Sequence, residues 1–378
     1  MHRSQRKPST TARRHFPRLL GCAGCLAAAL LLSSCSSLPP SRRDLSFPVE
    51  SPTPPRYSLV FIIHGDGSYL YHDTRGVAHR ADQEALGGAR RVAAMNPQAE
   101  VFVFHQRPRR RALLFFPRPD GRLYYYRQGR LLAEEPYWRG PGRSPLGPEA
   151  ELYHRYRAGA QLRPVSIFLY FGHEIPEFGG LGYDASYSDR ALTVNDLASG
   201  LKRIARDSAK IDLVVLSTCF NGTPHTVSAL SPYARTIIAS PGNLHLSYLD
   251  LRAFERLDDG LGDGDVPAFA ARCAQRAFER LAEELQTGVT VSVYDVDRVR
   301  EYVGSVDSAY NQALTALAGQ GPGVREHGDC ADNPAYALPG MSRGVDVFYR
   351  PPRFGRLKHK QGHSGWGCWI VPGQIVAH

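Results

Sequence analysis

The chain has 378 residues with a formal net charge of +10, and 43% of its residues are hydrophobic, enough to bury a large core. Six of the 46 Lys and Arg residues but none of the 36 Asp and Glu residues lie within residues 1–34, so the charge of the remaining chain is only +4. The high content of basic residues is therefore excluded as evidence for nucleic acid binding, and we expect no nucleic acid partner.

The first 35 residues have the order of a bacterial export signal. A basic segment, residues 1–18, precedes an apolar stretch from Leu19 to Leu32, and Ser33-Ser34-Cys35 follows. The apolar stretch has the length of a signal-peptide core and is too short for a membrane span. Its end resembles the lipobox of bacterial lipoproteins, in which the cysteine receives lipid, palmitate included, and becomes the mature N-terminus. We therefore expect a lipoprotein signal peptide over 1–35 and a lipid anchor at Cys35 that attaches the exported chain to a bacterial cell membrane, with an ordinary signal peptide as the alternative.

Residues 36–56 are rich in Pro and Ser and lack apolar periodicity, which predicts a flexible tether. The cysteines beyond the leader contain no CxxC pair, so we expect no zinc site. Outside the cytoplasm a disulfide can form among three of them. These three are Cys273, Cys330 and Cys368, and the fourth is Cys219.

Strands and helices alternate from residue 57 onward. Tyr57–His64 is a continuous apolar run, as in a strand buried on both faces. Turn-forming residues at Pro119-Asp120-Gly121 predict a hairpin within residues 112–138, with a loop over 139–149. The cluster Arg107–Arg111 is expected to be a solvated loop or a contact to an anionic surface. The other elements expected in this half are a helix over Ala81–Ala94 and a strand over Glu100–His105.

The second half repeats the alternation. Thr193 or Asn195 is expected to cap a helix that extends through Arg206. Helices between strands predict right-handed crossovers and a mainly parallel sheet. The last 55 or so residues are rich in Gly, Pro and Arg and show no period, so residues 321–378 receive no assignment. The remaining expected elements are strands ending at His173 and Cys219, a helix near Thr223–Leu230, a strand over Arg235–Ala239, a helix over Pro267–Leu285 and a strand over Val289–Tyr294.

Two of these strands end in residues with nucleophile and base chemistry. The carboxyl ends of neighbouring parallel strands meet at one edge of a sheet, where ligands and catalytic residues gather. His173 and Cys219 at this edge would form a base and a nucleophile, since the thiolate is the attacking species. Backbone amides over 220–222 are candidates to stabilise a thiolate or an oxyanion. The alternative is a buried, inert cysteine beside a structural histidine.

The order of these segments resembles that of the clostripain-like cysteine peptidases, relatives of caspases, gingipains and legumains. The resemblance implies a caspase-like three-layer α/β/α domain over 57–320 with a mainly parallel sheet, and an endopeptidase that cuts protein or peptide substrates through a thioacyl-enzyme. It makes His173 the general base and acid, Cys219 the nucleophile, and the backbone N–H groups of Glu174 and Cys219 the oxyanion donors. It implies no metal or other cofactor except calcium, for which the sequence shows no ligands. The matching segments are Gly172-His173-Glu174, Gly179–Asp184, Leu192–Ile204, Ser217-Thr218-Cys219, Ile237–Ser240 and Val291–Asp295.

Two residues depart from that family's pattern. Glu174 stands where the family has Gly, and Ser217 stands where clostripain-like enzymes carry an Asp that lines the substrate pocket. Glu174, Glu177 and Asp184 are candidates to supply a carboxylate to this pocket beside Ser217, and the alternative is a neutral pocket. The departures leave open a catalytically inactive caspase-like binding lipoprotein.

A serine hydrolase is a lesser alternative. His64-Gly65-Asp66-Gly67 resembles an oxyanion loop of α/β-hydrolases. The G-x-S-x-G motif of that fold is absent, since the nearest match, Gly362–Trp366, has Trp in place of the last Gly. Otherwise His64 is expected to lie at the rim of the caspase-like site.

Overall fold

The structure is a computed structural model. The predicted signal peptide, Cys35 and nearly all of the predicted tether lie outside the described residues. A compact unit spans Thr53–His378. The described residues are 54–72, 75–112, 115–140, 142, 144–157, 163–206, 210–244, 250–261, 265–318 and 326–370.

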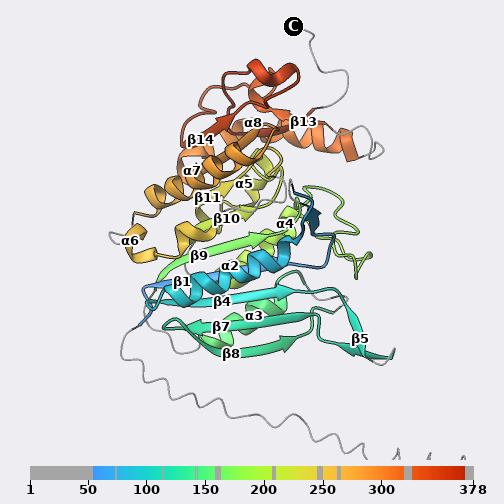
Figure 1. Cartoon of the computed structure of the whole chain (residues 1–378). Helices are drawn as coiled ribbons and strands as arrows, with labels where there is room; N and C mark the ends of the chain where they lie inside the picture. Colours follow the sequence, from blue (N-terminus) through green and yellow to red (C-terminus); the bar gives the residue numbers. More distant parts are fainter. Residues whose placement is uncertain are drawn as a thin grey trace, which may run out of the picture. The chain divides into compact units, whose positions relative to one another are not determined.

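A nine-stranded sheet forms the centre of this unit, in the order β14-β12-β11-β10-β9-β1-β4-β7-β8 (Figure 1). Its five central strands are parallel: β1 (Tyr57–His64), β4 (Ala99–Gln106), β9 (Val165–Phe171), β10 (Ile211–Ser217) and β11 (Ala234–Ala239). Antiparallel strands extend both edges: β12 (Val289–Asp295), β14 (Val345–Arg350), β7 (Gly121–Arg127) and β8 (Arg130–Tyr137).

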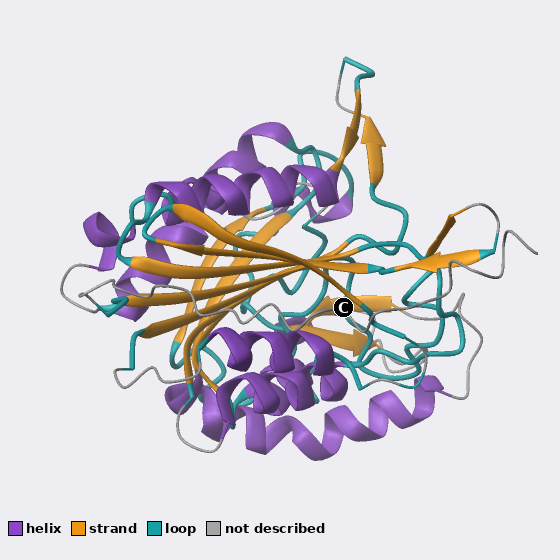
Figure 2. Ribbon diagram, turned by 90° about the horizontal axis from the view of Figure 1, so that it is seen from below, coloured by secondary structure: helices purple, strands orange, loops and turns teal. Residues whose placement is uncertain are grey.

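Helices cover both faces of the sheet, which gives three layers (Figure 2). One hydrophobic core lies against α3 (Gly147–Tyr156), α4 (Val194–Ala205), α5 (Pro224–Leu230) and α8 (Val296–Ala318). The other core lies against α2 (Ala81–Met95), α6 (Leu257–Leu261) and α7 (Val266–Glu284). The predicted α/β fold with a mainly parallel sheet is confirmed.

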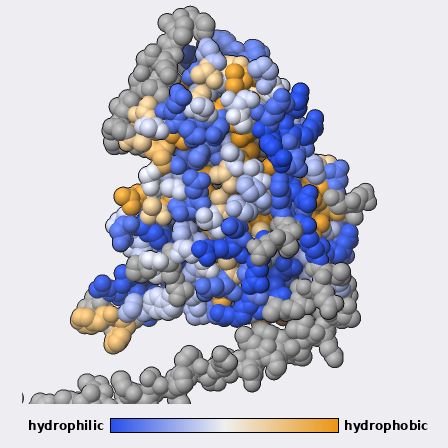
Figure 3. Space-filling model, turned by 180° about the vertical axis from the view of Figure 1, so that it is seen from behind, coloured by the Kyte–Doolittle hydropathy of each residue, from blue (hydrophilic) through white to orange (hydrophobic). Residues whose placement is uncertain are grey.

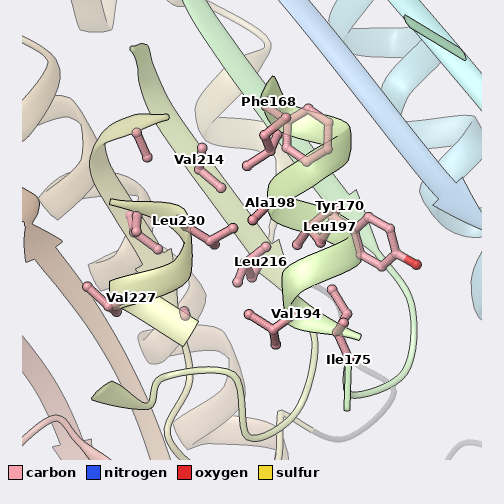
Figure 4. Packing of buried hydrophobic residues seen from close by; sticks show 14 of the residues in the cluster. Phe168, Tyr170, Ile175, Val194, Leu197, Ala198, Val214, Leu216, Val227 and Leu230 are labelled. Atoms are coloured by element: carbon pink, nitrogen blue, oxygen red, sulfur yellow. The ribbon is translucent and has the colours of Figure 1, made fainter. Parts of the chain in front are cut away.

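Successive side chains of the buried strands pack alternately into the two hydrophobic cores. In β1, Phe61 packs into one core and Ile62 into the other, because successive strand residues point to opposite faces. Thr193 caps α4 and forms a capping box with Asp196, as one of the two predicted caps. Figure 4 shows the resulting contact, in which Leu197 and Ala198 of α4 lie over β9 and β10.

The hairpin in the first half turns later than predicted. Gln128 and Gly129 join β7 to β8 with left-handed φ angles of 53° and 72°. The predicted turn residues instead lead from the short strand β6 (Phe116–Arg118) into β7. There the buried carboxylate of Asp120 accepts hydrogen bonds from the Arg139 N–H at 2.8 Å and from a tyrosine hydroxyl, so this Asp is a structural acceptor and not a turn former. The expected loop over 139–149 is also too long, since α3 begins at Gly147.

The unassigned C-terminal residues complete the same unit. β14 pairs with β12 at the sheet edge, and β13 (Glu326–Asp329) pairs with β15 (Gly367–Ile370). A disulfide joins Cys330 to Cys368, which is one of the pairings that the sequence left open. Within the described ranges no helix is both long enough and apolar enough to cross a bilayer. The shorter paired strands are β2 (Leu70–His72) with β3 (Ala78–Arg80), and β5 (Arg110–Ala112) with β6.

Candidate active site

The register of β9 and β10 brings the two predicted reactive residues to one edge of the sheet. Phe171, the last residue of β9, pairs with Ser217, the last residue of β10, in parallel. His173 and Cys219 each follow two residues later. The predicted adjacency of these strands is therefore confirmed, and α4 is the crossover between them.

The loop after β10 presents Cys219 on a constrained backbone. Phe220 has a φ of 52°, a left-handed conformation that costs free energy for a bulky residue and that is often found at functional sites. The Phe220 N–H donates to Gly242 O at 3.0 Å, and the Gly222 N–H donates to Ser240 O at 2.8 Å. These two amides are therefore engaged, contrary to the expectation that the amides of this loop would stabilise a charge. The Cys219 thiol is half-buried and donates to Asn243 Oδ1 at 3.1 Å.

Asn221 connects the Cys219 loop to the loop after β9. Its Oδ1 accepts from the Ile175 N–H at 2.9 Å, and its Nδ2 donates to Ile175 O at 2.8 Å. The same Oδ1 accepts from the Thr218 hydroxyl at 2.7 Å. Because Asn221 is fully buried, these bonds replace water for every polar atom involved. The side chain therefore fixes the spacing of the loops that carry His173 and Cys219.

The loop after β1 orients the His173 ring. Nε2 of His173 lies 3.0 Å from the Ser68 carbonyl oxygen, which can only accept, so this nitrogen carries the proton. In the neutral imidazole Nδ1 is then the acceptor. The Tyr69 ring stacks on the His173 ring at a centroid distance of 4.4 Å, and its hydroxyl accepts from the His173 backbone N–H at 3.1 Å.

Behind Tyr69 lies a buried polar network. His64 Nδ1 is 2.6 Å from the Tyr69 hydroxyl, and His64 Nε2 is 2.8 Å from Asp184 Oδ1. Burial lowers the pKa of His64, so the ring is neutral: Nε2–H donates to Asp184 and Nδ1 accepts from Tyr69. Burial opposes ionisation of Asp184, but the hydrogen bond from His64 and the charge of Arg139 hold the pKa of its carboxyl well below the usual value.

Several predicted site residues lie elsewhere than expected. His64 is buried and does not lie at a rim, and its hydrogen bonds join it to Tyr69 and Asp184. Asp184 is also buried, and its carboxylate binds Arg139 and Arg190, so it cannot line a substrate pocket. Ser217 is buried at the strand end, whereas Glu174 is half-buried beside His173.

Glu177 is likewise a structural anchor and not a pocket residue. Its buried carboxylate accepts hydrogen bonds from side chains of α5, α8 and β15. Tyr310 donates from 2.8 Å and the indole of Trp369 from 2.6 Å. With its oxygens engaged, Glu177 holds β15 against α5 and α8. The other donors are the hydroxyls of Thr223 and Thr226.

Sequence reasoning missed the groups that orient the site. Ser68 acts through its backbone carbonyl, which the residue type does not reveal. For Asn221 the sequence suggests a role only for the backbone N–H, whereas its side chain makes the connecting hydrogen bonds. Tyr69 had one usable signal: it follows β1, which pairs with β9, so the loop after β1 lies at the edge that carries His173.

Comparison with known proteins agrees with this geometry. Residues 171–325 match the sequence model of the clostripain family, Peptidase_C11. This segment is similar in sequence to the clostripain family. It contains both His173 and Cys219 and the Gly-rich loop between α4 and β9. No curated protein is a significant match to the chain.

Solved structures of C11 proteases share the fold beyond the clostripain-family segment. An inactive zymogen C11 protease from Parabacteroides distasonis superposes with a TM-score of 0.57 at 12% identity, over 85% of this chain and 94% of that chain. A secreted C11 cysteine protease from Bacteroides thetaiotaomicron, solved with an irreversible peptide inhibitor, gives 0.51 at 13% identity, over 86% and 92%. At such identities the likeness shows a shared fold.

Proposed function

We propose that this chain is a cysteine endopeptidase that cleaves protein or peptide substrates through His173 and Cys219. The observation that carries the proposal is the paired register of Phe171 and Ser217, which brings a histidine and a thiol to adjacent strand ends. The hydrogen bond between His173 Nε2 and Ser68 O supports it further, because it leaves Nδ1 as the proton acceptor.

The proposed reaction has two steps. Nδ1 of His173 takes the thiol proton, the Cys219 sulfur bonds to the substrate carbonyl carbon, and the C–N bond breaks as His173 gives the proton to the leaving amine. Water then loses a proton to His173 and attacks the thioester, which releases the acid and regenerates the thiol. The backbone N–H groups of Glu174 and Cys219 are the proposed donors to the oxyanion.

The carboxylates near the site bear on substrate preference. Glu177 and Asp184 bind other side chains, and Ser217 carries no charge. We propose that Glu174, the half-buried residue directly after His173, attracts a substrate Arg or Lys. If cuts follow basic residues, Glu174→Gln should lower kcat/KM for them about tenfold, as expected for a lost charge-assisted hydrogen bond.

Mapping of cleavage products tests the activity. Residues 53–378 are incubated with a mixed peptide library, and the cuts are identified by mass spectrometry. Cys219→Ala and His173→Ala should each lower cleavage at least about a thousandfold. Cys273→Ala, which removes a buried thiol from α7, should retain it.

Two outcomes would contradict the proposal. Cleavage of the same bonds by Cys219→Ala would mean that the site is wrong. A folded wild-type protein that cuts nothing, and whose Cys219 resists thiol-directed inhibitors, would instead support the catalytically inactive binding protein.

The leader supports attachment of the chain to a bacterial membrane through lipid on Cys35. Cells that express the full chain are fed an alkyne analogue of palmitate, and the label on the protein is measured. Cys35→Ala should lose the label, while Cys25→Ala should keep it. Equal labelling of both variants would overturn lipidation at Cys35.

A further inference from the structure

The hairpin formed by β5 and β6 presents apolar side chains to solvent. It pairs outside the central sheet, and Figure 1 shows β5 extending away from the body of the unit. Phe115 is 79% exposed and Phe116 is 64% exposed. In Figure 3 an apolar projection lies at the lower left, at the position of this hairpin. Adjacent exposed aromatic residues at a protruding tip cost solvation free energy, so they indicate a binding role.

Arginines surround these aromatic residues. Arg109, Arg110, Arg111 and Arg118 are all exposed, and none forms an ion pair with a carboxylate of the described residues. Arg110 lies directly opposite Arg118 in the strand register. Like charges in directly opposed positions destabilise a strand pair. The hairpin therefore concentrates positive charge at a cost to its own stability, which an anionic partner would remove.

We propose that this hairpin docks on the surface of an anionic lipid bilayer. Phe115 and Phe116 would enter the interface between headgroups and acyl chains, while the arginines bind lipid phosphates. A second copy of this chain is a poorer partner, because two such hairpins would bring their arginines together. An acidic protein surface would satisfy the charge but would not account for two exposed aromatic side chains.

The base of the hairpin fixes its direction relative to the candidate active site. β5 follows β4, whose carboxyl end lies at the same sheet edge as that of β9. The Arg109 N–H donates to Ser186 Oγ at 2.8 Å, and Ser186 belongs to the loop after His173. Docking through the hairpin would therefore bring the edge that carries His173 and Cys219 toward the lipid surface, independently of whether the site cleaves peptides.

Vesicle binding tests the proposal with residues 53–378, a unit that contains the whole sheet and both hydrophobic cores. Co-sedimentation is measured with vesicles of phosphatidylcholine alone and with vesicles that also contain phosphatidylglycerol. Binding should require phosphatidylglycerol and weaken at high salt. Phe115→Ser with Phe116→Ser should lower partitioning at least about tenfold. Arg110→Glu with Arg111→Glu should lower it by at least about a factor of twenty-five.

Matched controls and a local probe make the test specific. Phe354→Ser and Arg300→Glu change exposed residues of the same types elsewhere and should bind as the parent does. Phe116→Trp should show a blue-shifted tryptophan emission with anionic vesicles, measured as the difference between the spectra of this variant and the parent. Circular dichroism confirms that each variant is folded.

Three results would overturn the proposal. One is the absence of vesicle binding by the folded parent. Another is equal binding to vesicles with and without phosphatidylglycerol. The third is a concentration-dependent dimer that Phe115→Ser abolishes, since this would assign the hairpin to contact between two copies of the chain.

Discussion

Tyr69 contacts His173 in two separate ways, through its ring and through its hydroxyl. The ring stacks on the imidazole, and the hydroxyl accepts from the His173 N–H at 3.1 Å and donates to His64. Tyr69→Phe keeps the ring and removes both hydrogen bonds. We expect kcat on a peptide substrate to fall about fivefold with little change in KM, because the lost hydrogen bond to the His173 N–H is worth about 1 kcal/mol.

A neighbouring tyrosine provides the control for this substitution. Tyr71 donates through its hydroxyl to Glu84 at 2.9 Å and does not contact His173, so Tyr71→Phe should leave kcat unchanged. The pH dependence of kcat should also move in Tyr69→Phe, since the hydroxyl links His173 to the buried His64. Equal kcat values and pH profiles in the two variants would assign Tyr69 to packing alone.

At the scale of elements, the connection between the loops after β9 and β10 depends on one amide side chain. Asn221→Asp keeps the acceptor for the Ile175 N–H but removes the donor to Ile175 O. A buried carboxylate would then face a carbonyl oxygen. We expect the free energy of unfolding to fall by about 1–3 kcal/mol and cleavage activity to fall with it. Chemical denaturation of the wild type and the variant measures this difference.

An exposed asparagine gives the matched comparison. Asn195 lies exposed in the first turn of α4, where a negative charge is favourable for the helix dipole. Asn195→Asp should therefore change stability little. A loss in Asn195→Asp as large as that in Asn221→Asp would mean that the loop connection has no special role.

The packing of β13 behind the Cys219 loop predicts a pH dependence. The ring of His327 contacts the ring of Phe220 edge to face, with 5.2 Å between the ring centroids. Burial lowers the pKa of His327 from 6.5 to about 3. Between these values the unfolded chain binds a proton that the folded chain does not, so stability falls as the pH is lowered from about 6.5 toward about 3. His327→Gln should remove this part of the pH dependence, measured as the unfolding free energy of wild type and variant across that range. His359→Gln, a change at an exposed histidine, should follow the wild type.

The elements differ in how well their residues could be interpreted from the sequence alone. β1 was predicted at its observed bounds, because a strand buried on both faces is an uninterrupted apolar run. The turn at Gln128-Gly129 was missed, since Pro119-Asp120-Gly121 carries stronger turn residues and the burial of Asp120 depends on distant partners. α8 was not predicted at all, although Val296 and Tyr310 pack into the core.

The residues of the candidate site also differ in how well they could be predicted from the sequence. His173 and Cys219 were predictable because each follows an apolar strand. Their orienting partners were not, since the Ser68 carbonyl and the amide of Asn221 act through contacts between segments that are distant in sequence. For Glu177 and Asp184 the charge of the side chain suggests a place in a substrate pocket. Their carboxylates instead accept hydrogen bonds from buried donors, which the sequence does not reveal.

At the scale of the whole molecule, the described cysteines occupy three environments. Cys219 lies half-buried at the carboxyl edge of the sheet, Cys273 is fully buried in α7, and Cys330 and Cys368 form a buried disulfide. Burial raises the pKa of the Cys273 thiol, which suppresses the reactive thiolate there. Reactivity toward a thiol reagent therefore depends on the fold and not on the number of cysteines.

Maleimide labelling of residues 53–378 tests this difference. The native protein should take up one label, at Cys219, and Cys219→Ala should take up none. In denaturant without reductant the wild type should take up two labels, because Cys273 becomes exposed while the disulfide persists. In denaturant with prior reduction it should take up four. Intact mass spectrometry counts the labels, and peptide mapping locates them. A native label on Cys273, or four labels without reduction, would contradict the distribution of thiols on which the role of Cys219 depends.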